Sequence, residues 1–495
     1  MCLIDLGGRA PRPGDQIELE FERLSEAGGC LGTIVVPIGP QQEPRRYRVE
    51  VPRGLLPGER ARVSLTKRYR RTFQARALSL LRPSPHRQDP RCIHARGLGR
   101  ALCGGCAMQT LDYSQQLALK QQRVERQLAA ANVDPRLILP IVACDSPYFY
   151  RNKMEFSFAG EPAAKVALGL HPPGYRYDVV DLSGCQLLSP FTGPLLEAVR
   201  GWANATELPV FSPRQQCGWL LQLTVREGKN TNERLLELLT STEDPVSTAQ
   251  RHRPAQALAE GLVTAVLAAA DQSAQPIDSI YWTRKRAQRG QPTTLEQTLL
   301  FGKAAIDERL DLPDGRSLTF SIDPRAFFQP NPRQAQQLYG LVIAGFAERP
   351  VARLLDLYCG TGTIGLSLAN ACQEVVGVEL SQPAVDQARA SALRNQIANA
   401  RFFVGDAAKV LEEDLRDQRF DGLVVDPPRN GLSTAALERV LTVDAARLIY
   451  VSCNPAALAR DIHGLDQRYK LRSAQPVDMF PHTAHVETVA ILDRR

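Results

Sequence analysis

The sequence predicts a multidomain chain with a small β-barrel over residues 1–82, an α+β region over 83–320 and a doubly wound α/β domain over 321–495. Three observations predict this division. Short β-rich runs separated by Gly and Pro fill the first part, and a cysteine cluster opens the second. In the third part strands alternate with helices. At 495 residues the chain is long enough for several hydrophobic cores.

Charge and composition narrow the class of protein. The net charge is +7, but residues 60–91 carry ten Lys or Arg and a single acid, Asp89. A local basic surface of this kind suits a phosphate backbone. No apolar run approaches the roughly 20 residues that a membrane span needs, and the N-terminus lacks the apolar core of a signal peptide. We therefore expect a cytoplasmic protein in which clustered cysteines serve a metal or catalysis rather than disulfides.

The first 82 residues predict a barrel of short strands: PGDQIELEFERL, GCLGTIVVP, RRYRVEVPRG and GERARVSLTKRYRRTFQARAL are β-rich and end at Gly or Pro. The run Lys67 to Arg71, with Phe73 nearby, combines charge with aromatic rings. That combination suits an RNA backbone and base stacking. A solvated basic edge strand is an equal alternative.

A cysteine cluster follows the Pro-rich segment PSPHRQDPR. Cys92 precedes Cys103-Gly-Gly-Cys106, so three thiolates could hold one metal or cluster. The fourth ligand must come from elsewhere, and Cys185 in DLSGCQLLSP is the candidate. Local spacing does not separate zinc from an iron–sulfur cluster, and unrelated free thiols are the remaining alternative.

The rest of the central region mixes helix and strand. LDYSQQLALKQQRVERQLAAANV has apolar residues at helical intervals, while YRNKMEFSFAG, KVALGLHPPG, GWLLQLTVRE and SIYWTRKRAQRG are typical of strands. Arg151 and Lys153 are interpreted as surface charges on a strand, with contact to RNA as the alternative.

The α/β domain contains a glycine-rich turn in LLDLYCGTGTIGLSLA, residues 354–369. An apolar strand ends near Tyr358, and Gly360 begins a G-x-G-x-x-G pattern that opens a helix. Alone, this pattern is a weak signal for a dinucleotide site, and an ordinary strand, turn and helix is the alternative. About twenty residues later, VVGVEL ends in Glu379, where an acid can bind ribose hydroxyls.

Other features favour S-adenosylmethionine over NAD as the ligand. Asp356 lies just before the glycine turn, where an acid can face the methionine end. VVDPPRNGL, residues 424–432, has no role in hydride transfer. Asp406, directly after FFVG, is placed to receive an adenine amino group, and Gln329 and Asn331 lie in a loop before a helix.

RLIYVSCNPAALARDI, residues 447–462, contains the candidate nucleophile. Cys453 follows a strand and precedes a helix, whose N-terminus is expected to lower the thiol pKa. A small buried hydrophobe is the alternative role for such a cysteine. Because the strand end faces the expected methyl donor, we interpret Cys453 as a nucleophile.

A cysteine nucleophile beside a methyl donor predicts a pyrimidine substrate. Thiolate addition at carbon 6 makes carbon 5 nucleophilic, and a base must later remove the carbon 5 proton. Glu487 in HVETVAIL is the chosen base, because an unpaired carboxylate on an apolar strand tends toward a raised pKa. His482 and His485 are rivals. Asp426 is expected to orient the uracil or the backbone, or merely to cap a loop.

At this point the chain resembles the RNA uracil-5-methyltransferases over nearly its whole length. DLYCGTGTIGL, VDPPRNGL, VSCNP and HVETVA look like successive motifs of that family, and FFQPN resembles the segment before them. The resemblance implies that Cys453 is the nucleophile and Glu487 the proton-abstracting base. It places these residues at cofactor or active-site positions: Gln329, Tyr358, Gly360, Thr363, Glu379, Asp406 and Asp426.

The resemblance extends to the other two parts. The N-terminal unit is similar to the TRAM domain, an RNA-binding barrel. Cys92, Cys103, Cys106 and Cys185 look like a four-cysteine [4Fe-4S] site, which favours ribosomal RNA members over the transfer RNA enzyme. The gap from Cys92 to Cys103 is longer than the family pattern, so Cys92 is the least secure ligand.

The expected function is therefore methylation of carbon 5 of a uridine in RNA, with 23S ribosomal RNA favoured, through a covalent Cys–uracil intermediate. We expect a monomer without DNA or membrane partners. The same chemistry on transfer RNA is one alternative. An iron–sulfur NAD oxidoreductase would have no use for Asp-Pro-Pro or Ser-Cys-Asn-Pro, and a non-catalytic RNA-binding protein would have no use for Cys453 and Glu487.

Overall fold

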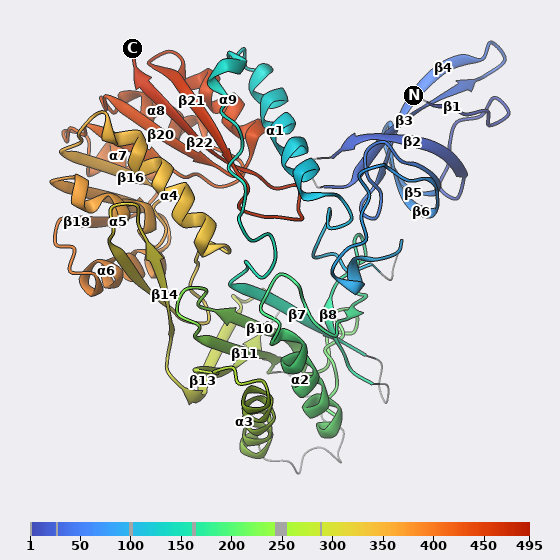
Figure 1. Ribbon diagram of the computed structural model, residues 1–495, viewed down its shortest axis with the longest axis horizontal. Helices are drawn as coiled ribbons and strands as arrows, with labels where there is room; N and C mark the ends of the chain where they lie inside the picture. The colour runs from blue at the N-terminus through green and yellow to red at the C-terminus, as the bar shows by residue number, and fades with distance from the viewer. Residues whose placement is uncertain (1, 26–27, 99–101, 161–164, 243–254, 288–289) are drawn as a thin grey trace.

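The computed structural model describes residues 2–25, 28–98, 102–160, 165–242, 255–287 and 290–495. Figure 1 shows three lobes: the N-terminal strands in blue, a central sheet mostly in green, and a C-terminal sheet in yellow to red. Within the described ranges, no helix is both long and apolar enough to cross a membrane.

The N-terminal lobe is a closed barrel with one short extra strand. β3 pairs with both β2 and β4, and β4 also pairs with β6, so the sheet order β3-β2-β5-β6-β4 closes on itself. Alternate residues face the core, as the period-2 pattern predicts. The predicted barrel is confirmed. Its strands are β1 (Cys2–Leu3), β2 (Gln16–Leu24), β3 (Cys30–Ile38), β4 (Glu43–Val51), β5 (Arg60–Tyr69) and β6 (Thr72–Arg82).

One expectation about this barrel is wrong. Phe73 is fully buried, with its ring centroid 5.9 Å from that of Tyr47, so it cannot stack on a base. The alternation along β6 turns Phe73 inward, and the guanidinium of Arg68 lies 5.6 Å from its ring centroid. Tyr69, which is 57% exposed, is the aromatic residue that this basic hairpin presents to solvent.

The central lobe is a mixed seven-stranded sheet with two helices packed against it. The sheet order is β13-β12-β11-β10-β7-β8-β9, and α2 (Thr192–Thr206) and α3 (Ala255–Gln272) share its core. Only the β11–β12 pair is parallel among the described pairings of this sheet. The strands are β7 (Lys153–Ala159), β8 (Ala167–Leu170), β9 (Val180–Asp181), β10 (Leu220–Glu227), β11 (Arg234–Ser241), β12 (Ser279–Arg286) and β13 (Thr294–Gly302).

The segment after the cysteines packs on the C-terminal lobe. After the 3₁₀ turn η1 (Ile93–Ala95), helix α1 (Tyr113–Ala129) buries Val124 and Leu128 in the core of the C-terminal sheet. The ammonium of Lys120 lies 2.5 Å from the carboxylate of Asp478, and both side chains are buried. The chain then passes through η3 (Pro135–Leu137), and Val142 forms a parallel bridge with Val477. This segment therefore ties the cysteine region to the C-terminal lobe.

The C-terminal lobe is the predicted doubly wound α/β domain. Its sheet order is β18-β17-β16-β19-β20-β22-β21, in which β16 to β20 are parallel and β22 runs antiparallel between β20 and β21. The strands are β16 (Arg353–Leu357), β17 (Glu374–Glu379), β18 (Ala400–Val404), β19 (Gly422–Val425), β20 (Arg447–Ser452), β21 (Tyr469–Val477) and β22 (Glu487–Arg494). The helices are α4 (Pro332–Ala347), α5 (Thr363–Leu368), η4 (Ala369–Ala371), α6 (Gln382–Arg394), α7 (Ala407–Glu413), α8 (Thr434–Thr442) and α9 (Pro455–Leu465).

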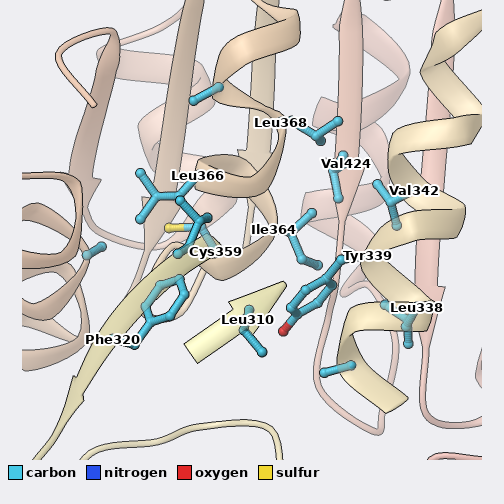
Figure 2. Close-up of a cluster of buried hydrophobic side chains, with 14 of the residues drawn as sticks. Leu310, Phe320, Leu338, Tyr339, Val342, Cys359, Ile364, Leu366, Leu368 and Val424 are labelled. Atoms are coloured by element: carbon cyan, nitrogen blue, oxygen red, sulfur yellow. The ribbon is translucent and has the colours of Figure 1, made fainter. Parts of the chain in front are cut away.

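A hairpin from the middle of the chain completes this core. β14 (Ile306–Asp311) and β15 (Ser317–Ile322) pair only with each other among the described strands. Figure 2 shows Leu310 of the hairpin next to Tyr339 of α4, and Phe320 of the hairpin near Cys359 and Leu366. The hairpin thus packs on α4 and α6, and the Arg316 guanidinium between its two strands donates a 2.7 Å hydrogen bond to the Ser367 carbonyl of α5.

Candidate active site

The predicted site residues of the C-terminal lobe gather at one edge of its sheet. Parallel strands end at the same edge, and the antiparallel strand β22 begins there. Ser452 pairs with Thr488, so Cys453 and Glu487 lie next to each other just beyond that pair. The residues at this edge are Tyr358 and Gly360 after β16, Glu379 ending β17, Asp406 after β18, Asp426 after β19, Cys453 after β20 and Glu487 beginning β22.

The glycine turn leaves open space over its backbone. Gly360 and Gly362 have positive φ angles of 54° and 79°. A Cβ at Gly362 would lie 3.1 Å from Ala388 and Phe402, whereas a Cβ at Gly360 would meet no atom within 4 Å. Tyr358 also adopts a positive φ of 62°, which is uncommon for an aromatic residue and typical of functional turns. A ligand can therefore approach the backbone closely at Gly360.

Asp356 lies beneath this turn with an unused hydrogen-bond acceptor. Its side chain is fully buried, and Oδ2 accepts a hydrogen bond of 2.9 Å from the Gly365 amide. Oδ1 has no hydrogen-bond partner among the described residues. Burial, with smaller contributions from Asp426 and Glu379, raises the pKa of Asp356 to about 8. An ammonium group placed here would satisfy Oδ1 and stabilise the carboxylate, which fits the amino group of S-adenosylmethionine.

The other predicted cofactor residues have identifiable local roles. The Glu379 carboxylate accepts hydrogen bonds from the Gly360 amide at 3.2 Å and the Ser381 amide at 2.9 Å. The Thr363 hydroxyl lies 3.0 Å from the Tyr339 hydroxyl. Asp406 is exposed and caps α7 through amides of the first turn. These contacts hold the turn and the two acids in position, so they prepare the edge for a ligand.

Gln329 comes to the C-terminal lobe from the loop before α4. Its carbonyl accepts a 2.9 Å hydrogen bond from the Asn152 side chain of the central lobe. Asn331 caps α4, and its side chain donates a 3.2 Å hydrogen bond to the carbonyl of Met479, which lies eight residues before the start of β22. The loop therefore joins the central sheet to the segment that precedes Glu487.

The predicted low pKa of Cys453 is wrong for the protein without ligands. Burial raises the pKa of this thiol to about 11, and the nearby carboxylates of Glu487 and Asp426 raise it further, while Arg429 lowers it. Cys453 does precede α9, as predicted, but Asn454 caps that helix and occupies its first amide. Desolvation and two neighbouring acids thus outweigh the helix N-terminus.

The raised pKa predicted for Glu487 is confirmed. It is buried at the start of β22, and burial raises the pKa of its carboxyl to about 8, with Asp426 raising it and Arg429 lowering it. Burial also raises the pKa of Asp426 to about 7. Three acid–base groups with pKa values displaced toward or above neutrality therefore lie at one edge of the sheet, a pattern typical of functional sites.

The two histidine rivals differ from Glu487 in their surroundings. His482 is buried, its Nδ1 lies 3.2 Å from the Gln116 amide nitrogen, and its ring lies against Tyr148 with centroids 4.5 Å apart. Burial lowers the pKa of both His482 and His485 to about 4. His482 is therefore held in a structural hydrogen-bond network, and neither imidazole has a pKa near neutral pH.

Arg429 is the site residue whose role the sequence analysis missed. It lies in the Asp-Pro-Pro-Arg loop, and its charge lowers the pKa of both Cys453 and Glu487. The Asn454 side chain donates a 2.9 Å hydrogen bond to its carbonyl, and buried Asp461 accepts a 2.8 Å hydrogen bond from the Leu432 amide. Its position in VDPPRNGL was visible in the sequence, but its neighbours were not.

The four predicted cysteine ligands line one small cavity in the central region. Cys92, Cys103, Cys106 and Cys185 share its wall with apolar residues such as Leu170 and Leu182. Burial raises the pKa of the Cys103 thiol to about 12 and that of Cys185, with further contributions from neighbouring thiols. Within the described part of the chain, no group of three or more His, Cys, Asp or Glu side chains is arranged around a single metal ion.

This fold, with its glycine turn and the acid that ends β17, defines the class of S-adenosylmethionine-dependent methyltransferases. Residues 293–495 match the family described as tRNA (Uracil-5-)-methyltransferase. The chain is 34% identical over 452 residues to an uncharacterized RNA methyltransferase of Protochlamydia amoebophila, covering 88% of this chain and 98% of that protein. It is also 34% identical to an uncharacterized RNA methyltransferase of Lactiplantibacillus plantarum, covering 97% and 93% of the two chains.

A solved structure agrees with these sequence matches. The crystal structure of Pyrococcus abyssi tRNA (uracil-54, C5)-methyltransferase with S-adenosyl-L-homocysteine has a TM-score of 0.70 and 25% identity, covering 96% of this chain and 100% of that one. The chain belongs to the RNA (uracil-5-)-methyltransferase family. It is an enzyme that uses S-adenosylmethionine to methylate uracil in RNA.

Proposed function

We propose that this enzyme methylates carbon 5 of one uridine in 23S ribosomal RNA through a covalent bond between Cys453 and the uracil. The observation that carries the chemistry is the adjacency of Cys453 and Glu487 beyond the Ser452–Thr488 pair, at the edge that also holds the glycine turn. The division into a TRAM-like barrel, 1–82, a central domain, 83–320, and a methyltransferase domain, 321–495, is part of this proposal.

Four residues hold the cofactor in this proposal. Asp356 faces the amino group of the methionine part, Glu379 the ribose, and Asp406 the adenine, while the open backbone at Gly360 lets the ligand approach. When bound, S-adenosylmethionine supplies an electrophilic methyl group on a sulfonium. Tyr358, Thr363, Gln329 and Asp426 complete the proposed cofactor and uracil contacts.

The chain's own residues perform the remaining chemistry. The Cys453 thiolate forms a bond to carbon 6 of uracil, and the displaced π electrons move onto the carbonyl oxygen at carbon 4 as an enolate. Carbon 5 then forms its bond to the methyl group as the methyl–sulfur bond breaks. Glu487 removes the carbon 5 proton, the carbon 5–carbon 6 double bond re-forms, and the Cys453 thiolate leaves. Arg429 favours the ionised forms of both residues.

The charge of Arg429 predicts the pH dependence of the reaction. Because the Cys453 pKa is about 11 and the Glu487 pKa about 8 before ligands bind, kcat/KM should rise as pH increases from 7 to 9. Arg429→Ala should raise both pKa values and move the rising limb to higher pH. Arg429→Lys should restore it. Initial rates measured across this pH range test the prediction, and an unshifted profile in Arg429→Ala would contradict it.

Replacing Asp356 with Asn should weaken cofactor binding but stabilise the ligand-free protein. Asp356→Asn should weaken S-adenosylmethionine binding by roughly tenfold or more, because a charge-assisted hydrogen bond to the ammonium is lost. In the ligand-free wild type, the pKa of Asp356 is higher in the folded protein, about 8, than in the unfolded chain. The folded protein therefore loses stability as the pH rises from the unfolded pKa toward about 8. The asparagine variant should therefore gain melting temperature relative to wild type, and gain more at pH 9 than at pH 6. Calorimetric titration and thermal melts measure the two effects; a variant that binds the cofactor as wild type does would contradict the first.

An open cleft supports an RNA substrate. It has a volume of about 590 Å³ and lies where the barrel, the cysteine loop, the central sheet and the segment before Glu487 meet. Arg53, Arg151 and Lys153 line it, and Phe327, which is 64% exposed, stands at its wall. Cationic groups with an exposed aromatic ring suit a single-stranded nucleic acid.

We further propose that Cys92, Cys103, Cys106 and Cys185 hold a [4Fe-4S] cluster. Their shared cavity supports this, because a [4Fe-4S] cluster takes one cysteine thiolate per iron. Cys106→Ser should lower bound iron and acid-labile sulfide in anaerobically purified protein and lower its melting temperature. Cys217→Ser, at a partly buried cysteine outside the cavity, is the matched control. Equal iron in both variants would remove the cluster from the proposal.

The four-cysteine cavity favours ribosomal RNA, because the family resemblance links such a site to its ribosomal RNA members. The barrel does not discriminate, since the similar tRNA (uracil-54, C5)-methyltransferase structure covers 96% of this chain. Transfer RNA is the second candidate, since the similar solved structure is named as a tRNA (uracil-54, C5)-methyltransferase. Methyl transfer from labelled S-adenosylmethionine to unmodified 23S ribosomal RNA and transfer RNA, followed by nucleoside analysis, tests the proposal. Labelled 5-methyluridine in 23S ribosomal RNA is expected, and label in transfer RNA alone would overturn the substrate.

A further inference from the structure

A second hollow also touches the segment that precedes Glu487, at Ala484. It has a volume of about 410 Å³ and separates the end of β2 in the barrel from one face of α1. We call it the barrel–α1 groove. It is lined by Glu22, Arg23, Leu24, Ser25, Leu119, Lys120, Gln122, Arg123, Arg126, Gln127 and Ala484.

The charge of the barrel–α1 groove suits a polyanion. Its helical wall follows the spacing 119, 122, 123, 126 and 127, which is one stripe of a helix, while the neighbouring stripe is buried in the C-terminal lobe. Arg123 and Arg126 from this stripe and Arg23 from the barrel face the same hollow, with Glu22 as the acid among the lining residues. Arg23 and Arg126 are exposed, so an incoming phosphate can reach them.

The barrel–α1 groove and the cleft described above meet at a single residue. Ala484 lines both hollows, and it precedes Glu487 by three residues. The Arg123 guanidinium donates a 2.7 Å hydrogen bond to the Ala484 carbonyl, so the wall of the groove also fixes this turn. The two hollows therefore adjoin at the segment that leads into Glu487.

This geometry matches what a target uridine within a strand requires. A base must leave its stack to reach Cys453, while the chain on both sides of it remains continuous. The cleft can accommodate one flank, and the other flank needs its own cationic path away from the active site.

We propose that the barrel–α1 groove binds the phosphate backbone of single-stranded RNA on one side of the target uridine, while the cleft binds the RNA on the other side. This inference rests on the proposed function. It makes Arg23 and Arg126 binding residues that contribute to affinity rather than to the chemical step.

The test compares two double variants that lose the same charge. Arg23→Ala/Arg126→Ala removes the two exposed arginines of the groove. Arg416→Ala/Arg419→Ala removes two exposed arginines between α7 and β19 that line neither hollow. The probe is a fluorescein-labelled 30-nucleotide oligouridylate, and its Kd is measured by anisotropy from low to moderate salt. Thermal melts and S-adenosylmethionine titration verify that both variants are folded.

The groove variant should bind the oligouridylate roughly tenfold more weakly, and its slope of log Kd against log salt should fall by about 1.4, because each single-strand phosphate contact contributes about 0.7. The control should match wild type. In methyl transfer, the groove variant should show a raised KM for RNA with kcat unchanged. Equal Kd and slope in the two double variants would overturn the inference.

The anisotropy measurement separates this inference from the proposed function, since it needs no turnover. If wild type methylates RNA and the groove variant binds the oligouridylate as tightly as wild type, only the inference about the groove is rejected. If wild type makes no 5-methyluridine in any RNA but the groove variant binds the oligouridylate more weakly than wild type, the proposed function is rejected. The groove is then still supported as an RNA-binding site.

Discussion

Cys453→Ala is expected to abolish formation of 5-methyluridine while leaving RNA and S-adenosylmethionine binding intact. Without the thiol, no bond forms at carbon 6 and carbon 5 remains a poor nucleophile, so the rate should fall by at least about a thousandfold. Binding should persist because Asp356, Glu379 and the two hollows are untouched. Single-turnover methyl transfer and RNA anisotropy measure the two properties on the same protein.

Cys372→Ala provides the matched control for this variant. Cys372 precedes β17 at the opposite end of the strands from Cys453, and it is also only partly buried. It should retain wild-type turnover. Measurable turnover in Cys453→Ala would reject the nucleophile, and loss of RNA binding together with activity would show that the residue acts through folding instead.

Glu487→Gln is expected to trap a covalent protein–RNA adduct. Addition and methyl transfer do not need this carboxylate, but removal of the carbon 5 proton does, so the methylated adduct should accumulate. Steady-state turnover should fall by roughly 10²- to 10⁴-fold. Denaturing gel electrophoresis with labelled RNA detects the adduct, and mass spectrometry after nuclease digestion locates it on Cys453.

The double variant Cys453→Ala/Glu487→Gln is the control, since it lacks the residue that would be trapped. It should form no adduct while still binding RNA. The glutamine variant should fold at least as well as wild type, because it removes a buried carboxyl whose pKa is about 8. Near-normal turnover without an adduct in Glu487→Gln would mean that another group, such as His485, removes the proton.

Local patterns were sufficient to predict the elements of the C-terminal lobe. The apolar run before Gly360 is strand β16, the acid of VVGVEL ends β17, and Cys453 follows β20, all as expected from periodicity and turn residues. Strand ends are local features, and parallel strands bring them to one edge whatever the side-chain details. For that reason the candidate residues could be selected before their distances were known.

The electrostatics of the same residues could not be predicted in this way. The helix that follows Cys453 suggested a lowered thiol pKa, but burial and the carboxylates of Glu487 and Asp426 raise it. Those carboxylates lie 34 and 27 residues away in the chain. The role of Arg429 was missed for the same reason, because its effect depends on which groups the fold places beside it.

The sequence by itself determined the family, the order of its parts and the candidate chemistry, because motif spacing and hydrophobic period are properties of neighbouring residues. Only the tertiary structure decided which side chains are buried and which distant segments are in contact. It turned Phe73 into the barrel core, packed α1 on the C-terminal lobe, and gathered Cys92 and Cys185 on one cavity wall with Cys103 and Cys106. It also brought two cationic hollows together at Ala484, since contacts between distant segments depend on packing that no local pattern encodes.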